Sequence, residues 1–267
     1  MSIQAGERWD ELVELAVEEG LAGIERLSGI PGTVGAGPIQ NIGAYGQTLA
    51  ETLTSVRAFD RVEGHIVDLS RTECRFGYRT SVFRQDPQRF VVLSVDLGLH
   101  PTRIGGPIGH GELAEALGLQ ENSPAPLVDI RQAVLALRRS KGMVLDPKDP
   151  DTCSAGSFFL NPTVDLRRVE KLRRQLSTEK DEPIGRQLTD GHLELYAAKL
   201  IEHAGFHKGY GDPRGIAISS KHALALTNRG GGSAQELVRL GKEISNRVET
   251  MFGVCLNPEP SFVGHSW

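Results

Sequence analysis

Two polar side chains of this chain stand among aromatic residues, where a charge or a hydroxyl could act on a substrate. Arg79 is flanked by Phe76, Tyr78 and Phe83 in the run FGYRTSVF. Its planar guanidinium suits a carboxylate, and this segment alone favours a structural ion pair over a substrate contact. Ser157 stands in SAGSFFLNP, after small residues and before two phenylalanines. A hydroxyl in apolar surroundings is a candidate proton donor, although the pattern by itself favours an ordinary turn serine.

Two further charged residues are candidates for substrate binding or catalysis. Lys141 follows Arg138 and Arg139, and three cations at the end of a helix either complement the helix dipole or offer a lysine to a diphosphate. Glu259 lies between two prolines, which hold its backbone rigidly, and an exposed turn acid fits the same pattern. No G-x-S-x-G elbow is present, so the serines do not indicate a hydrolase triad.

The run Gly29–Gly46, GIPGTVGAGPIQNIGAYG, combines six glycines with two prolines. That density excludes a helix or a central strand. Apolar residues within the run indicate that it is packed: Ile30, Val34, Ile39, Ile42 and Tyr45. A packed glycine-rich loop presents backbone N–H groups to a closely approaching ligand, usually a phosphate or a flat cofactor ring. A buried crossover loop without a ligand is an equal alternative.

The composition excludes several classes of protein. The 267 residues suit one large domain or two modest ones, and 39% hydrophobic residues permit a sizeable core. A net charge of −4 argues against a surface for nucleic acid or for an anionic membrane. We find no apolar run of membrane-spanning length and no signal-peptide pattern. Three widely spaced cysteines indicate reduced thiols in a cytoplasmic protein, and no metal-ligand spacing is present.

The candidate residues must be positioned by a mixture of helices and strands. Apolar periodicity predicts helices over residues 7–19, 129–140 (with Asp129 as a candidate cap), 165–176 and 193–204, and a long helix that begins at a capping box of Ser233 and Glu236. Strands are predicted near residues 53–59, 66–69, 90–99, 216–218, 223–226 and 254–256. Residues 101–127 are rich in glycine and proline, which marks a domain boundary.

These segments together resemble the UDP-N-acetylenolpyruvoylglucosamine reductase (MurB) family. The likeness runs from about Ala5 to Gly264 and is nearly continuous over Gly29–Gly46. It includes the arginine of CRFGYR, the lysine of LRRSK, the serine of AGSFFLNP and the glutamate of LNPE. The chain departs from the family at four positions: His110 stands where relatives often carry tyrosine, Leu160 where they often carry lysine, and Pro260 and Ser261 where they carry valine and arginine.

The resemblance implies an α+β fold, in which the remainder of a PCMH-type FAD-binding domain precedes an α+β substrate-binding domain. The expected parts are residues 1–100 (FAD-binding), 101–127 (connecting), 128–256 (substrate-binding) and 257–267, a C-terminal segment with a catalytic glutamate. The family has an N-terminal lobe with a second glycine-rich segment ahead of this chain's first helix. We therefore expect that lobe to be missing, through a fragment or a misplaced start, and FAD affinity to be weak.

The resemblance also implies an activity: NADPH-dependent, FAD-mediated reduction of UDP-N-acetylglucosamine enolpyruvate to UDP-N-acetylmuramate in peptidoglycan synthesis. It assigns catalysis to Arg79, Ser157 and Glu259. It assigns FAD binding to Gly29, Pro31, Gly32, Val34, Gly35, Gln40, Asn41, Gly43, Ala44 and Tyr45. It assigns the UDP-sugar to Lys141, Asn161, His110 and His222, with Lys221 undecided between substrate and surface. The alternatives are a flavin-free or inactive fragment that only binds the nucleotide sugar, and another flavoprotein oxidase, which the joint match at the three catalytic positions disfavours.

Overall fold

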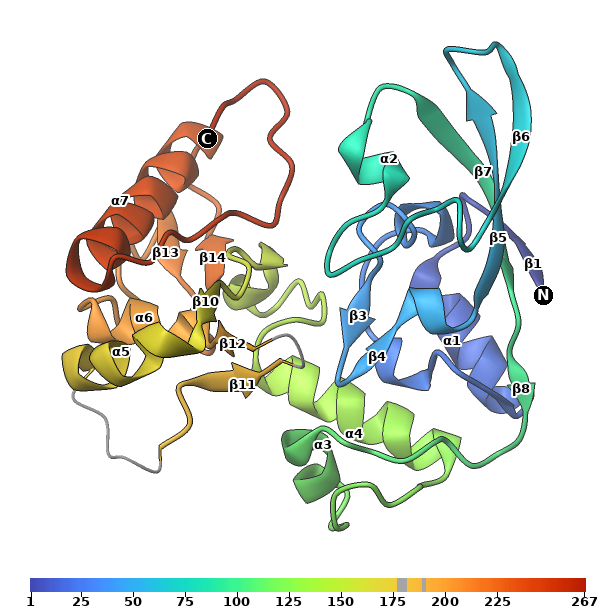
Figure 1. The fold of residues 1–267 in the computed structure, drawn as a ribbon, viewed down its shortest axis with the longest axis horizontal. Helices are drawn as coiled ribbons and strands as arrows, with labels where there is room; N and C mark the ends of the chain where they lie inside the picture. The colour runs from blue at the N-terminus through green and yellow to red at the C-terminus, as the bar shows by residue number, and fades with distance from the viewer. Residues whose placement is uncertain (177–181, 189–190) are drawn as a thin grey trace. The chain divides into compact units, whose positions relative to one another are not determined.

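The computed structural model describes residues 1–176, 182–188 and 191–267, and it divides into two compact units, Met1–Ser140 and Lys141–Trp267 (Figure 1). Both units combine helices with antiparallel sheets, which confirms the expected α+β class. The division falls after helix α4 (Leu127–Ser140), so this helix belongs to the first unit. The expected substrate-binding part began at residue 128 and therefore differs from the structural unit by that helix.

The first unit is built on a four-stranded sheet in the order β1-β7-β5-β6. Its strands are β1 (Ser2–Gln4), β5 (Leu53–Asp60), β6 (His65–Ser70) and β7 (Phe90–Leu97). Strands β5 and β6 confirm the strands predicted near residues 53–59 and 66–69, and they pair as a hairpin with Val56 opposite Leu69 and Phe59 opposite Ile66. Alternate residues of β5 are buried, since successive side chains of a strand point to opposite faces.

Helix α1 (Trp9–Glu18) covers the core of this unit and confirms the helix predicted over residues 7–19. Its buried residues recur at helical spacing: Trp9, Leu12, Val13, Ala16 and Val17. Shorter elements complete the unit: β2 (Leu21–Ala22) with β8 (His100–Pro101), η1 (Glu25–Leu27), η2 (Val34–Ala36), β3 (Gly43–Ala44) with β4 (Gln47–Thr48), η3 (Leu49–Glu51) and α2 (Val82–Gln85).

Residues 101–127 contain a helix that the sequence did not predict, α3 (Gly111–Ala116). Leu113 and Ala114 of α3 pack with Ile130 and Val134 of α4 in a small separate core. The glycines and prolines around α3 concealed it, because six residues are too few to show a helical period. Asp129 lies in the first turn of α4 rather than at its cap, since the helix begins two residues earlier.

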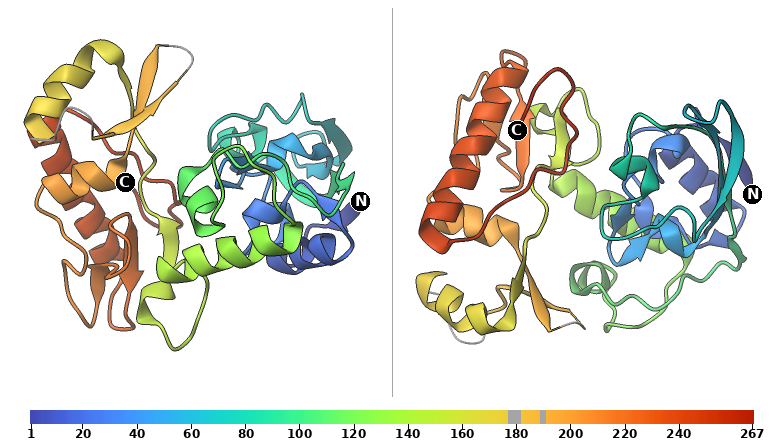
Figure 2. Two further views of the ribbon diagram at one scale, coloured as in Figure 1. Left: turned by 90° about the horizontal axis from the view of Figure 1, so that it is seen from below. Right: turned by 45° about the horizontal axis from the view of Figure 1, so that its top comes forward.

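The second unit contains two three-stranded sheets, ordered β10-β12-β11 and β13-β14-β9. Their strands are β9 (Ser154–Ser157), β10 (Thr163–Asp165), β11 (Gly185–Gln187), β12 (His192–Leu195), β13 (Ile216–Ile218) and β14 (Ala225–Asn228). Helix α7 (Ala234–Phe252) lies along β13 and β14 (Figure 2). The predicted capping box of Ser233 and Glu236 opens α7, and Gly253 ends it in the left-handed region. No helix among the described residues has the length and apolar character needed to cross a membrane.

Three predictions in this unit are corrected. The helix predicted over residues 193–204 is wrong at its start, because residues 192–195 form strand β12 and α6 covers only Ala197–His203. The helix predicted from residue 165 begins as the 3₁₀ turn η5 (Leu166–Arg168), and α5 covers Val169–Leu176. The strand predicted over residues 254–256 is absent, although Val254 and Leu256 are buried. Apolar spacing there reflects burial in the core and not pairing with another strand.

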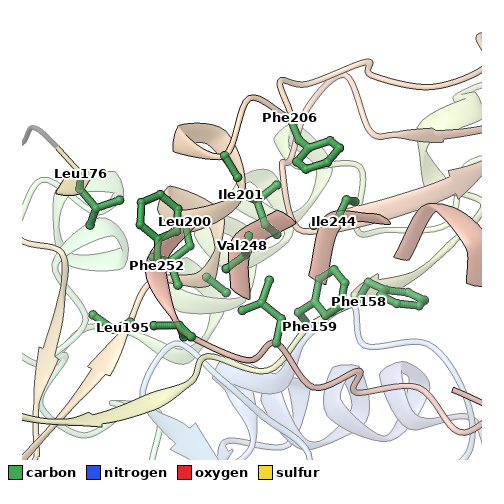
Figure 3. Packing of buried hydrophobic residues seen from close by; sticks show 14 of the residues in the cluster. Phe158, Phe159, Leu176, Leu195, Leu200, Ile201, Phe206, Ile244, Val248 and Phe252 are labelled. Atoms are coloured by element: carbon green, nitrogen blue, oxygen red, sulfur yellow. The ribbon is translucent and has the colours of Figure 1, made fainter. Parts of the chain in front are cut away.

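The core of the second unit fixes the segment that follows β9. Phe158 and Phe159 are almost fully buried and lie in one cluster with Ile244, Val248 and Phe252 of α7 (Figure 3). Burial of two phenylalanines contributes several kcal/mol, roughly 2 to 3 for each side chain. Such anchoring leaves little freedom to the residue immediately before them, Ser157.

Candidate functional site

The glycine-rich run Gly29–Gly46 is braced at its start by a carboxylate of helix α1. Asp10 Oδ1 accepts hydrogen bonds from the Gly29 N–H at 2.6 Å and from Arg131 Nη1 at 2.7 Å, and Arg131 Nη2 donates to Oδ2 at 3.1 Å. Burial alone would raise the pKa of Asp10, but the hydrogen bonds from Arg131 and Gly29 outweigh it and lower that pKa. The carboxylate therefore stays ionised and ties the loop to α1 and α4. No local pattern in the sequence indicates this brace, because Asp10 and Arg131 are 121 positions apart.

The middle of the run serves packing. The N–H groups of Val34 and Gly35 donate to the carbonyls of Glu7 and Ala5, at 2.8 and 2.9 Å. A Cβ atom at Gly35 would lie 2.5 Å from Ala5 Cβ, so only glycine fits there. Val34 is fully buried. Val34 and Gly35, both expected to bind the cofactor, thus hold the loop against Ala5 and Glu7, which follow β1.

The exposed turn Pro31–Thr33 is different, because its backbone is open. Gly32 has a φ of +103° and no heavy atom within 4 Å of where its Cβ would lie. Within the part of the chain that the structure describes, the N–H groups of Gly32 and Thr33 make no hydrogen bond. Bare, outward-facing N–H groups beside a glycine suit a phosphate or a polar ring edge. This turn fits the cofactor that the sequence implied.

The end of the run folds into a tight hairpin of β3 and β4. Its two central residues, Tyr45 and Gly46, have φ values of +49° and +79°, as a two-residue hairpin turn with matching twist requires. Burial raises the pKa of Tyr45 to about 12, so its hydroxyl remains a donor at neutral pH. The Tyr45 ring meets the His110 ring edge to face, with centroids 5.1 Å apart. His110 thus lies beside the glycine-rich run, at the N-terminus of α3.

Asn41 and Gln40 tie the run to the neighbouring segment of the first unit. Asn41 has a φ of +49°, accepts a hydrogen bond from the Ala50 N–H at 3.0 Å and donates one to the Gly77 carbonyl at 3.1 Å. Gln40 Oε1 accepts from Arg84 Nη1 at 2.6 Å. These hydrogen bonds join the loop to residues 77 and 84, within and just after the CRFGYRTSVF segment.

Arg79 reaches the glycine-rich run directly. Arg79 Nη2 donates to the Gly43 carbonyl at 2.7 Å, and Nη1 donates to the Asn41 carbonyl at 3.4 Å. A Cβ atom at Gly43 would lie 3.0 Å from Nη1, so the glycine leaves room for the guanidinium. The two carbonyl oxygens orient the guanidinium, and its planar fork has the geometry that suits a carboxylate.

In the second unit, the structure brings together the segments that carry Ser157 and Glu259. Ser157 is the last residue of β9 and lies opposite Ala225 of β14. The Glu259 N–H donates to the Phe158 carbonyl at 2.8 Å, and the Leu160 N–H donates to the Asn257 carbonyl at 2.9 Å. The C-terminal segment thus runs along residues 158–160 and places Glu259 next to the residue that follows Ser157.

The remaining expected substrate residues have structural neighbours. Asn161 Oδ1 accepts a hydrogen bond from the Ala197 N–H at 3.0 Å and so caps α6, which leaves its amide nitrogen for other contacts. Lys141 directly follows the last residue of α4. His222 lies in the turn between β13 and β14, where its N–H donates to Ser219 Oγ at 3.3 Å.

An acidic pair ahead of β9 is a feature that the sequence analysis did not identify. Asp151 is buried and accepts hydrogen bonds from the Ser220 N–H at 3.1 Å and from Arg229 Nη2 at 2.7 Å. Burial opposes ionisation, yet hydrogen bonds from Ser220 and the charge of Arg229 keep the pKa of Asp151 low. Asp149 forms an ion pair with Lys221. Lys221 therefore has a structural partner, and the pair holds the segment that leads into β9.

Comparisons with known proteins agree with this organisation. Residues 147–263 match the model of the UDP-N-acetylenolpyruvoylglucosamine reductase C-terminal domain, and residues 1–70 match the model of an FAD binding domain. A crystal structure titled UDP-N-acetylenolpyruvylglucosamine reductase (MurB), from Thermus caldophilus, superposes with a TM-score of 0.61 at 23% identity. That superposition covers 97% of this chain and 71% of the other, and it shows a shared fold.

Relatives named UDP-N-acetylenolpyruvoylglucosamine reductase are closer in sequence. The protein from Salinispora arenicola is 48% identical over 263 residues, which cover 98% of this chain and 72% of the relative. The protein from Thermobifida fusca is 46% identical, over 98% of this chain and 74% of the relative. Identity at this level over nearly the whole chain leaves one assignment: the chain belongs to the UDP-N-acetylenolpyruvoylglucosamine reductase family.

Proposed function

We propose that the protein reduces UDP-N-acetylglucosamine enolpyruvate to UDP-N-acetylmuramate, with NADPH as reductant and FAD as bound cofactor, in peptidoglycan synthesis. The observation that carries the proposal is the backbone ladder between residues 158–160 and 257–259, which places Glu259 beside the Ser157 segment. Two residues 102 positions apart in the sequence, one a proton donor and one a carboxylate, are held by one core. Such convergence is what a catalytic pair requires.

FAD would be held by the glycine-rich run of the first unit. The proposed residues are Gly29, Pro31, Gly32, Val34, Gly35, Gln40, Asn41, Gly43, Ala44 and Tyr45. Among them, the exposed turn at Gly32 offers backbone donors, whereas Val34 and Gly35 fix the loop's position by packing against the rest of the first unit. When bound, FAD would supply the redox chemistry, which is hydride transfer from NADPH to the enol methylene carbon of the substrate.

The protein's own residues would handle charge and proton. Ser157 donates a proton to the carbon next to the one that receives the hydride, so that the double bond becomes saturated. Arg79, held by two carbonyls of the glycine-rich run, attracts the substrate carboxylate. Glu259, the third proposed catalytic residue, would stabilise the charge that develops while Ser157 donates its proton.

The UDP-sugar would be bound by Lys141, Asn161, His110 and His222. Lys141 suits the diphosphate as a point charge, and His110 offers a ring already oriented by Tyr45. We assign residues 1–100 to FAD binding, 101–127 to a connection, 128–256 to substrate binding and 257–267 to the segment with the catalytic glutamate. Since NADPH and nucleotide sugars are cytoplasmic metabolites, we place the reaction in the cytoplasm.

The two half-reactions can be tested separately under anaerobic conditions. The protein is mixed with FAD, then NADPH, then the enolpyruvyl nucleotide sugar, and flavin absorbance is followed. We expect bleaching with NADPH and recovery with the sugar. Ser157→Ala should leave the bleaching intact and slow the recovery by at least about a hundredfold. A variant that recovers at the wild-type rate would refute the role of Ser157, and the absence of any flavin signal would favour a protein that only binds the nucleotide sugar.

A further inference from the structure

A pocket of about 400 Å³ in the first unit shares only Asn41 with the residues proposed to bind FAD. Six residues line it: Asn41, Ala50, Arg71, Thr72, Arg75 and Phe76. Two of them are arginines, and no carboxylate is among them. The charge of the lining is therefore strongly positive, in a chain whose net charge is −4.

The two arginines are presented by one turn of backbone. Cys74 N–H donates to the Ser70 carbonyl at 3.0 Å, which closes a helical turn over residues 70–74. Arg71 lies within that turn and Arg75 follows it in the left-handed region; both side chains line the pocket, where their like charges repel one another. The nearest acid in sequence, Glu73, stays ionised, and its carboxylate accepts hydrogen bonds from the Ser70 N–H and hydroxyl, at 2.9 and 2.6 Å, rather than from either arginine.

Neither arginine is neutralised elsewhere. Among the residues that the structure describes, the guanidinium groups of Arg71 and Arg75 form no ion pair and no hydrogen bond. Arg57 and Arg89 of the same unit, by contrast, form ion pairs with Asp68 and Asp60. Two like charges that converge on a pocket without a counter-ion are complementary to an anion.

The backbone of the pocket is held in an uncommon conformation. Arg75 and Asn41 have φ values of +49°, in the left-handed region that non-glycine residues rarely occupy. Asn41 is fixed there by its hydrogen bonds with Ala50 and Gly77, and the Arg75 N–H donates to the Thr72 carbonyl at 3.2 Å. The left-handed turn at Arg75 directs its side chain to the pocket that Arg71 also lines. Strained residues of this kind persist where the surrounding structure holds them, often at ligand sites.

We propose that this pocket binds a phosphate-type dianion between Arg71 and Arg75. The fork of a guanidinium matches the oxygens of a phosphate, and two forks match its double charge. The Thr72 hydroxyl lines the same pocket and offers a further donor. The dianion has two possible sources, free inorganic phosphate or a phosphate group of a nucleotide such as the 2′-phosphate of NADP⁺. Binding of free phosphate is independent of the reductase activity, whereas binding of the NADP⁺ phosphate rests on the proposed function.

The test is calorimetric titration of the full chain with inorganic phosphate at low, constant ionic strength. We expect saturable binding of one phosphate per chain. Arg71→Ala and Arg75→Ala should each weaken it by roughly tenfold or more, since each removes charge-assisted hydrogen bonds. Arg75→Lys should lose less, because it keeps the charge without the fork. Arg61→Ala, which removes an exposed arginine outside the pocket, is the matched control and should bind like the wild type.

A second pair of titrations separates the two sources. If a nucleotide supplies the phosphate, the arginine variants weaken binding of NADP⁺ and leave that of NAD⁺ unchanged. If free phosphate is the ligand, the variants weaken phosphate binding alone. Urea unfolding of each variant confirms that it folds, as expected for exposed side chains. Absence of saturable phosphate binding to the wild type, or an equal loss in Arg61→Ala, overturns the proposal.

Discussion

Replacing Asp10 tests whether the glycine-rich run depends on a brace outside it. Asp10 accepts the Gly29 N–H and both terminal nitrogens of Arg131, at 2.6 to 3.1 Å. In Asp10→Ala all three hydrogen bonds are lost, and Arg131, whose side chain is only 10% exposed, retains Glu14 at 3.4 Å. In Asp10→Asn the acceptor for Gly29 remains, but the charge that pairs with Arg131 is removed.

The size of the effect follows from these contacts. A hydrogen bond to a charged group contributes about 1.5 to 3 kcal/mol to stability. Three such bonds would suggest about 5 to 9 kcal/mol, but the Asp10 side chain is 39% exposed, so solvent screening reduces the sum to about half. We expect Asp10→Ala to lower the free energy of unfolding by about 2 to 4 kcal/mol and Asp10→Asn by about 1 to 2 kcal/mol.

The assay is equilibrium unfolding in urea, with FAD affinity measured in parallel. Glu14→Gln is the matched control, because Glu14 is 57% exposed and its contact with Arg131 is longer. It should change stability by less than about 0.5 kcal/mol. If Asp10→Ala destabilises no more than Glu14→Gln, the brace contributes nothing and the reasoning fails. If the protein is destabilised but FAD binding is unaltered, Gly29 is not part of the cofactor site.

The same brace gives a pH dependence with a definite sign. The folded-state pKa of Asp10 lies below the ordinary value of 3.8, so its contribution is fully present above that value. It is lost as the pH falls through the lowered folded pKa. The difference in stability between wild type and Asp10→Asn should therefore be constant near neutral pH and shrink in acid below about pH 4. If the difference in stability instead shrinks above neutral pH, a group other than Asp10 is responsible for it.

Three further outcomes follow from local geometry. Gly35→Ala places a Cβ atom 2.5 Å from that of Ala5, so it should lower unfolding free energy in urea by about 1 to 3 kcal/mol. Ser233→Ala removes the capping box with Glu236 at the start of α7, which should cost about 1 kcal/mol in the same assay. Burial raises the pKa of Tyr45 to about 12, so this phenol should still be protonated near about pH 11. In an ultraviolet titration, Tyr45→Phe should therefore remove the absorbance change that occurs above that pH.

Each of these outcomes has its own control. Gly6→Ala has no heavy atom within 4 Å of the new Cβ and should change stability little, so an equal loss at both glycines would contradict the packing argument. Ser233→Thr keeps an acceptor and should retain most of the cap. An unchanged titration curve in Tyr45→Phe at high pH would show that another tyrosine ionises last.

Local pattern alone determined much of the fold. The alternation of β5 and β6, the helical period of α1 and the capping box before α7 are all readable from neighbours in the sequence. The motif residues Arg79, Ser157 and Glu259 could be singled out in the same way, by type and by likeness to a family. These features share one physical basis, since each depends on side chains within a few residues of one another.

Tertiary structure decided what those residues touch. Arg79 contacts two carbonyls of the glycine-rich run, and no local pattern encodes these contacts. Residues 192–195 form strand β12 despite a helical pattern of apolar residues, because pairing with β10 and β11 satisfies their backbone hydrogen bonds. The brace of Asp10 and Arg131 joins residues 121 positions apart, and the ladder at Glu259 joins segments about as distant. Periodicity cannot report such contacts, since they exist only once the chain has folded around its core.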